Sequence, residues 1–197
     1  MCYNIKKDER DNRLKTLIIN GSPRKNGDTA ALINTFRENL NSQYKIINSY
    51  YCNISPCVDC RFCRINKGCA IDDEMTELYR YIEECDNVLI ASPIYFSELT
   101  GRVLDIGSRL QTYFSMSRFR KEQPPIKPKK GAVILAGGGS GNPLTAYETA
   151  KRLLGMMNAC DVFPLVCSFN TDNTPSSQDK ETLEKVKKAA EFFNRTE

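Results

Sequence analysis

Short apolar runs alternate with longer stretches of helical periodicity along the chain, and this alternation constrains the fold more than any other feature. It repeats five times without a break in composition. Typical apolar runs are Lys15 to Asn20 and Gly131 to Ala136, and apolar residues spaced three and four apart follow each of them. Strands that alternate with helices in this way form βαβ units around a parallel sheet. We therefore expect an α/β fold with five parallel strands.

The predicted elements divide the chain into a short extension, residues 1–13, and one domain, residues 14–197. We expect strands at 15–20, 44–49, 87–91, 131–136 and 161–167. We expect helices at 28–40, 72–84, 101–116, around 147–157 and around 183–193. The segment 121–130 has three prolines and four lysines and is predicted to be an exposed connection.

The composition excludes several classes of function. The chain has no histidine, which rules out Ser-His and Cys-His catalysis and any metal site with histidine ligands. No apolar run reaches the roughly 18 residues that a membrane helix needs, so no membrane association is expected. A net charge of +4 is too small to favour nucleic acid as a partner. Residues 1–13 lack the apolar core of a secretory signal, so we expect a cytoplasmic protein.

The loops after the first, third and fourth predicted strands should meet at one site, because open α/β sheets bind ligands beyond the carboxyl ends of their strands. The first loop, Gly21 to Thr29, opens a helix whose unpaired amides favour an anion. Ser22 and Thr29 add hydroxyl groups, and Arg24 can pair with phosphate. The loop is neither a Walker A motif nor G-x-G-x-x-G. The alternative is a polar turn in which Asp28 or Thr29 caps the helix.

The other two loops add apolar surface and exposed backbone. Ser92 to Phe96 places two aromatic residues at the end of a central strand, where a flat heteroaromatic ligand would explain them. The alternative is that Tyr95 and Phe96 close the core. The glycine run from Gly137 to Gly141 allows backbone to approach a ligand and donate amides, although glycine runs also serve as hinges.

A cysteine-rich loop at residues 52–70 follows the second predicted strand. Four of the nine cysteines lie there within thirteen residues, in the spacing C-x2-C-x2-C-x5-C: Cys57, Cys60, Cys63 and Cys69. This compact spacing suits an iron–sulfur cluster, whereas structural zinc usually separates two C-x2-C pairs by a longer stretch. A cluster, a zinc ion and free thiols all remain open. The remaining cysteines beside predicted core segments are expected to act as small hydrophobic residues: Cys52, Cys85, Cys160 and Cys167.

Taken together, these motifs resemble the NAD(P)H-dependent FMN reductase and multimeric flavodoxin family, whose first loop reads Gly-Ser-Pro-Arg-x-x-Gly-Asn-Thr. The resemblance covers residues 14–195 and implies a flavodoxin-like three-layer sandwich with strand order 2-1-3-4-5. It implies FMN, with the phosphate held by Ser22, Arg24, Asn26, Asp28 and Thr29. The flavin ring would lie along Pro93, Ile94, Tyr95 and Phe96 and be bordered by Gly137, Gly138 and Gly139.

Asp28 departs from the family pattern, because the family usually has asparagine at this position. A carboxylate facing a phosphate dianion would repel it. We therefore expect the Asp28 carboxylate to turn away and cap helix amides, or to lie close to Arg24. Two further departures are Ser97, where the family has glycine, and Arg102, where the next helix commonly has lysine.

The cysteine spacing resembles that of the iron-sulfur flavoproteins, which implies that Cys57, Cys60, Cys63 and Cys69 hold a [4Fe-4S] cluster near FMN. Three functions are compatible with these features. The first is an FMN-dependent oxidoreductase that uses NAD(P)H to reduce flavin, a quinone or another acceptor. The second is an electron carrier that receives electrons from ferredoxin, and the third is a non-catalytic metal or redox sensor. The flavin would supply the difficult chemistry, so no catalytic side chain is predicted. Members of the family commonly assemble as homodimers or homotetramers, which is the expectation here.

Overall fold

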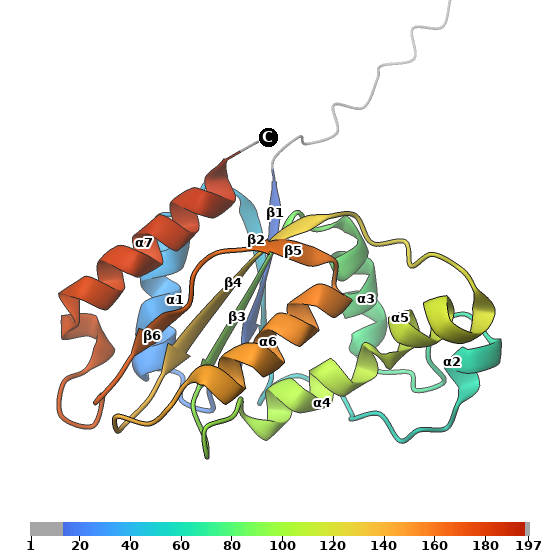
Figure 1. Cartoon of the computed structure of the whole chain (residues 1–197), viewed down its shortest axis with the longest axis horizontal. Helices are drawn as coiled ribbons and strands as arrows, with labels where there is room; N and C mark the ends of the chain where they lie inside the picture. Colours follow the sequence, from blue (N-terminus) through green and yellow to red (C-terminus); the bar gives the residue numbers. More distant parts are fainter. Residues whose placement is uncertain (1–13, 196–197) are drawn as a thin grey trace, which may run out of the picture.

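A parallel sheet lies between two layers of helices in the computed structural model, which describes residues 14–195 (Figure 1). The predicted extension, residues 1–13, lies outside the described residues. The strands are β1 (Lys15–Asn20), β2 (Gln43–Asn48), β3 (Asn87–Pro93), β4 (Lys129–Ala136), β5 (Ala159–Val162) and β6 (Val166–Ser168). All pairs are parallel, in the order β2-β1-β3-β4-β5, and β6 also pairs with β4. The predicted flavodoxin-like strand order is confirmed.

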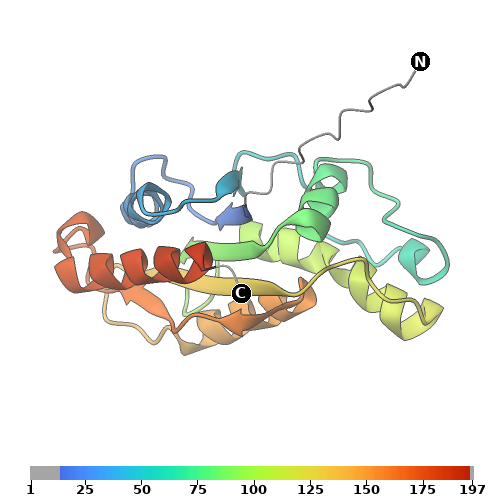
Figure 2. The same ribbon diagram turned by 90° about the horizontal axis from the view of Figure 1, so that it is seen from above.

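The helices divide between the two faces of the sheet. They are α1 (Asp28–Glu38), α2 (Phe62–Ile65), α3 (Met75–Glu84), α4 (Gly101–Arg109), α5 (Gln111–Ser115), α6 (Leu144–Met156) and α7 (Lys180–Asn194), with a π-helical turn η1 (Met116–Arg120) and a 3-10 turn η2 (Ser176–Gln178). Helices α1 and α7 cover one face, and α3, α4 and α6 cover the other (Figure 2). Among the described residues, no helix combines the length and apolar character needed to cross a membrane.

The alternation of side chains along each strand produces two separate cores. In β1, Leu17 and Ile19 are buried against α3 and α4, whereas Ile18 is buried on the opposite face with α1 and α7. Phe36 of α1 packs edge to face on Phe193 of α7 with ring centroids 5.4 Å apart. Each such buried side chain contributes about 1.5–3 kcal/mol. The cores fix the sheet and thereby the relative positions of the loops at its carboxyl edge.

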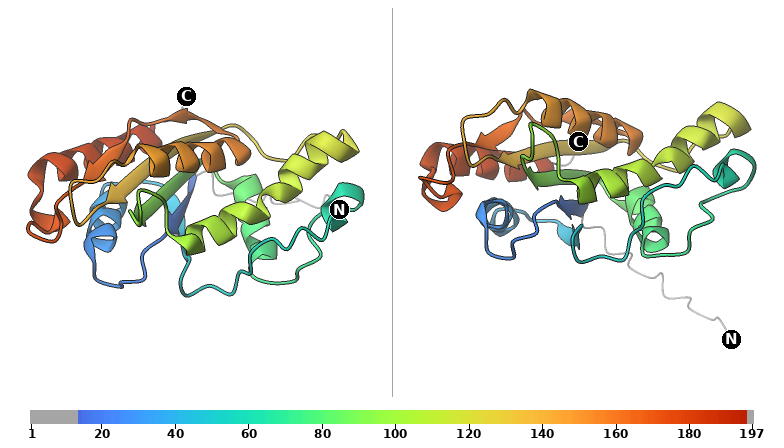
Figure 3. Two further views of the ribbon diagram at one scale, coloured as in Figure 1. Left: turned by 60° about the horizontal axis from the view of Figure 1, so that its bottom comes forward. Right: turned by 90° about the horizontal axis from the view of Figure 1, so that it is seen from below.

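Several boundaries differ from the predicted ones by a few residues, and three of the differences have a clear local description. The fifth predicted strand divides into β5 and β6 around Pro164, which has no amide hydrogen for the ladder. Helix α3 begins at Met75 rather than Asp72, because the Asp73 carboxylate accepts a hydrogen bond from the Met75 amide at 3.0 Å. The helix predicted for 101–116 continues as α4, α5 and η1 to Arg120. Figure 3 shows this segment extending past the sheet, beside the cysteine loop that carries α2.

Candidate functional site

The loop between β1 and α1 is held against the ends of two neighbouring elements. The Gly21 amide donates to the Ala91 carbonyl at 2.7 Å, and the Thr100 hydroxyl donates to the Gly21 carbonyl at 2.9 Å. The Ser22 hydroxyl accepts from the Arg24 amide at 3.1 Å, which folds the loop back on itself. These contacts fix the N-terminus of α1 at the carboxyl edge of the sheet.

A pocket of about 230 Å³ opens at this edge. Eight of the residues predicted for the site line it: Ser22, Arg24, Asp28, Thr29, Pro93, Ile94, Tyr95 and Gly138. The other four predicted residues are outside its lining: Asn26, Phe96, Gly137 and Gly139. The structure therefore brings three separate loops together in one pocket, while a ligand-binding role for each residue remains a prediction.

The N-terminal end of α1 suits an anion. Its first intrahelical bond runs from the Ala31 amide to the Gly27 carbonyl at 3.0 Å, so the amides of residues 28–30 have no acceptor within the helix. The helix dipole adds partial positive charge at the same end. Arg24 is exposed beside it, and its guanidinium forms no ion pair with another residue of the range 14–195. A phosphate group matches this arrangement in charge and in hydrogen-bonding capacity.

The Asp28 carboxylate bonds to η2, a turn that is distant in the sequence and packs against α1. Its Oδ1 accepts a hydrogen bond from the Ser176 amide at 2.8 Å, and Ser176 begins η2. The N-cap position of α1 is Gly27, which has no side-chain cap bond, and the ion pairs formed within residues 14–195 do not include one between Asp28 and Arg24. The sequence predicts that this carboxylate caps helix amides or lies close to Arg24. The amide that it accepts from belongs to η2, 148 residues away, and not to α1, while Asp28 and Arg24 both line the pocket.

A tight turn explains the different positions of the two aromatic residues after β3. Tyr95 and Glu98 exchange backbone hydrogen bonds of 2.9 and 3.0 Å, and the two residues between them, Phe96 and Ser97, have φ angles of 52° and 64°. These left-handed angles match a type I′ turn. The turn leaves the Phe96 ring fully exposed, whereas Tyr95 lines the pocket and is 45% exposed.

A fourth loop, which follows β6, also reaches the pocket and was missed from the sequence. The amides of Thr171 and Asp172 donate to the Gly137 and Gly138 carbonyls at 3.1 and 3.3 Å, and both residues line the pocket with Pro23 and Ala136. A Cβ atom on Gly138 would lie 2.5 Å from Asp172 Oδ2, so the exposed Asp172 side chain would have to move aside for any larger residue. The signal was available, because the loop follows the carboxyl end of a strand like the other three.

A second cavity, of about 420 Å³, is lined by all four cysteines of the predicted metal site: Cys57, Cys60, Cys63 and Cys69. All four are free thiols, Cys60 is exposed and the other three are half-buried. Within residues 14–195, no three Cys, Asp or Glu side chains lie close enough together to hold a metal ion. The structure thus places four thiols on one cavity without showing coordination geometry, and their role as ligands remains a prediction.

The cysteine loop rests along the face formed by α4, α5 and η1. The Ser108 hydroxyl accepts from the Cys57 amide at 2.9 Å, and the Cys63 sulfur lies 3.3 Å from the Ser115 hydroxyl. Arg120 Nη1 donates to the Cys63 carbonyl at 2.6 Å. Helical residues therefore determine where the loop backbone lies.

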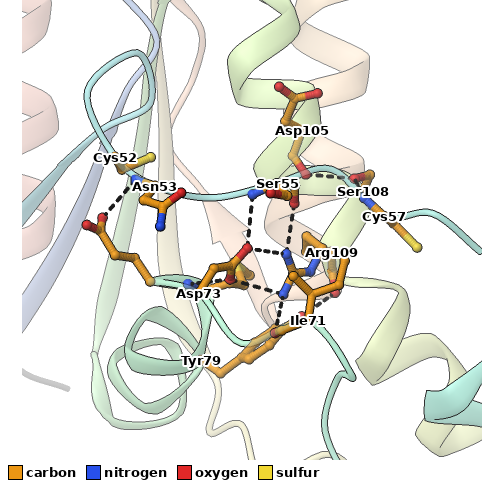
Figure 4. A network of polar contacts seen from close by, with 12 residues as sticks. Cys52, Asn53, Ser55, Cys57, Ile71, Asp73, Tyr79, Asp105, Ser108 and Arg109 are labelled. Carbon is orange, nitrogen blue, oxygen red and sulfur yellow. Dashed lines mark hydrogen bonds and ion pairs between the residues drawn. The ribbon is translucent and has the colours of Figure 1, made fainter. Parts of the chain in front are cut away.

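A buried ion pair lies beneath the same loop (Figure 4). Arg109 is 2% exposed, and its Nη1 and Nη2 donate to the two oxygens of Asp73 at 2.7 and 3.1 Å. Burial raises the pKa of Asp73, but the bonds from Arg109 and from the Ser55 and Met75 amides outweigh it and hold the pKa below its usual value. The sequence analysis did not predict a role for Arg109. It lies three residues after Ile106 on the buried side of α4, where a charged side chain is unusual.

The remaining cysteines differ in their surroundings. Burial raises the pKa of Cys85 to about 11 and that of Cys167 to about 12, and it also raises the pKa of Cys52. Cys85 packs as a small hydrophobic residue, as predicted. Cys160 is exposed on β5, so its expected place in or beside the core is wrong.

Comparison with protein-family models matches residues 14–174 to the family described as NADPH-dependent FMN reductase. Curated relatives include an iron-sulfur flavoprotein from Archaeoglobus fulgidus, 28% identical over 91% of this chain and 80% of the relative. An iron-sulfur flavoprotein from Methanosarcina thermophila is 28% identical, and the match covers 64% of each chain, so this chain spans less than two thirds of that relative.

Solved structures show the same fold. An NAD(P)H:quinone oxidoreductase from Methanothermobacter marburgensis superposes with a TM-score of 0.70 over 94% of this chain and 99% of the other. The two sequences are 14% identical, so this similarity concerns the arrangement of the strands and helices.

Proposed function

Because the chain belongs to the NADPH-dependent FMN reductase family, we propose that it is an oxidoreductase that binds FMN in the pocket at the carboxyl ends of β1, β3 and β4. One observation carries this proposal: residues from separate loops, each predicted to contact FMN, line one pocket beside the N-terminus of α1. When bound, FMN supplies the redox chemistry by accepting hydride or single electrons at its ring.

The lining residues divide into a polar part and an apolar part. The amides at the start of α1 and the Arg24 guanidinium would hold the phosphate. Pro93, Ile94 and Tyr95 would flank the ring, with the Gly138 backbone at its edge. The chain would thereby bind and orient the flavin, and no side chain needs to act as an acid or base.

We also propose that Cys57, Cys60, Cys63 and Cys69 hold an iron–sulfur cluster, because four free thiols line one cavity. When bound, the cluster would exchange single electrons. Helix α4 connects this cavity to the FMN pocket. Thr100, just before α4, bonds to Gly21, and Ser108 in its last turn bonds to Cys57. Gly101 and Ser108 are separated by a rise of about 10 Å along the helix.

The electron donor, the location and the assembly of the protein belong to the same proposal. Four thiols that could hold a cluster favour reduced ferredoxin as the electron donor, and membership of the family favours NAD(P)H as the second candidate.

The eight described cysteines are all free thiols, which fits the reducing cytoplasm. The exposed Phe96 and Leu144 offer apolar surface for a homodimer or homotetramer.

Stopped-flow measurements test the choice of donor. In anaerobically purified protein reconstituted with FMN, iron and sulfide, we expect reduced ferredoxin to bleach the flavin absorbance about tenfold faster than NADPH does at equal concentration. Faster bleaching by NADPH alone would favour direct nicotinamide use. A protein that remains colourless after incubation with FMN would contradict the FMN-binding function itself.

The substitution Asp28→Asn tests the phosphate end of the pocket. The asparagine oxygen can still accept from the Ser176 amide, so the change removes charge and keeps this contact. Loss of one negative charge near a phosphate dianion should tighten FMN binding about fivefold, or about 1 kcal/mol. Titration followed by flavin fluorescence measures this change.

The control for this test is Asp161→Asn, which removes an exposed carboxylate on β5 and should leave FMN affinity unchanged. Weaker or unaltered binding by Asp28→Asn would show that the phosphate lies elsewhere.

A further inference from the structure

The cysteine loop leaves the body of the domain and returns to it through a narrow neck, formed by Ser55 and Ile71. Each neck residue lies two positions outside the first and last of the four predicted ligands, Cys57 and Cys69. The Arg109 guanidinium bridges the neck: Nη1 donates to the Ser55 carbonyl at 2.8 Å and Nη2 donates to the Ile71 carbonyl at 3.2 Å (Figure 4). One side chain therefore joins the two ends of the loop.

Asp73 fixes the bridging guanidinium in place. Its carboxylate binds both terminal nitrogens of Arg109, and its Oδ2 also accepts from the Ser55 amide at 3.0 Å. The side chains of Arg109 and Asp73 are 0% and 4% exposed, so water does not compete for these bonds. Such a forked, charge-assisted arrangement is geometrically specific, and a lysine ammonium could not reproduce all of its contacts.

We propose that Arg109 is a positioning residue of the cysteine loop: it closes the neck so that the thiols of Cys57 and Cys69 face one cavity before any metal arrives. Closing a loop costs chain entropy, and a clamp formed during folding removes that cost from metal binding. The link to iron rests on the proposed function, whereas the closed neck is a property of the metal-free chain.

A second arginine, Arg120, holds the same loop, and both side chains act through their terminal nitrogens. The Nε atoms of Arg109 and Arg120 are buried and lack a hydrogen-bond partner within the described part of the chain. Arg120 also holds the cysteine loop, because its Nη1 donates to the Cys63 and Asn66 carbonyls. Both arginines thus hold the loop through backbone carbonyls, and neither is among the residues that line the cysteine cavity.

Crosslinking of the metal-free protein tests the clamp. The full chain with Cys60→Ala and Cys63→Ala is treated with a short bifunctional thiol reagent, and the Cys57–Cys69 crosslink is followed by mass spectrometry. Adding Arg109→Lys should slow crosslinking about tenfold, because lysine keeps the charge and loses the fork. A monofunctional alkylating reagent should modify both thiols at an unchanged rate. Arg152→Lys, on the exposed face of α6, is the matched control and should change neither rate.

Three outcomes decide the proposal. If Arg109→Lys slows crosslinking and leaves alkylation unchanged, the proposal is supported. If the Arg109→Lys variant crosslinks as fast as the protein that retains Arg109, the proposal is overturned. An equal fall in both rates also overturns it, because the change would then be one of accessibility. If Arg109→Lys fails to fold, the double variant Arg109→Met/Asp73→Asn, which leaves no unpaired buried charge, undergoes the same measurement.

A parallel measurement separates the clamp from the proposed function. With all four cysteines present, iron and acid-labile sulfide are determined after reconstitution, together with bound FMN. Arg109→Lys should lower iron and sulfide severalfold and leave FMN unchanged. If the unsubstituted protein takes up no iron while its crosslinking still depends on Arg109, the cluster assignment fails and the clamp stands.

Discussion

Replacing Cys60 with alanine is expected to abolish cluster binding and to leave FMN bound at full stoichiometry. Cys60 is exposed, so the substitution removes a thiol without opening a cavity in the core. A cluster held by four cysteines would lose one of its ligands. The FMN pocket is lined by other loops and should be unaffected. Iron and sulfide analysis, with the flavin spectrum, measures both cofactors on one sample.

The exposed Cys160 on β5 provides the control for this experiment. It lies outside the cysteine cavity, so Cys160→Ala should retain iron, sulfide and FMN. Unchanged iron in Cys60→Ala would contradict the assignment of the loop as the ligand set. Loss of iron from both variants would indicate that iron binds nonspecifically through exposed thiols.

The fold and the meeting of the loops in one pocket were largely predictable because each depends on a rule that acts locally. Alternating apolar runs and helical stretches give a parallel sheet, and parallel strands end at one edge. Loops that begin at Gly21, Ser92 and Gly137 must therefore meet, whatever the details of packing. The pocket contains residues from all three loops, as the sequence indicated.

The features that the sequence did not reveal depend mostly on contacts between residues far apart in the sequence. Arg109 is buried because Asp73, 36 residues earlier, neutralises it, and nothing local identifies that partner. The partner of Asp28 is an amide 148 residues away. The exposure of Phe96 results from left-handed angles at two residues that are not glycine, a conformation that their identities do not favour.

Substituting Gly21 with alanine is expected to have the second largest effect, lowering both stability and FMN affinity. A Cβ atom at this position would lie 2.5 Å from Val103 Cγ2 and 2.8 Å from the Ser92 hydroxyl oxygen. Both neighbours belong to packed elements, and the Gly21 amide and carbonyl are bonded to Ala91 and Thr100. Overpacking of this kind costs about 1–3 kcal/mol. The phosphate loop must then shift, and FMN should bind about tenfold to a hundredfold more weakly.

Two further variants separate this steric effect from a general intolerance of substitution. At Gly101, which begins α4, a Cβ atom would have no heavy atom within 4 Å, so Gly101→Ala should preserve stability and FMN affinity. Adding Val103→Ala to Gly21→Ala removes the shortest contact. The loss of stability in the double variant, measured by denaturant unfolding, should therefore be smaller than the sum of the two single losses. If the two single losses of stability are strictly additive, the loop after β1 accommodates a side chain without pressing on α4. The close approach of this loop to the helix would then not be what positions the phosphate site.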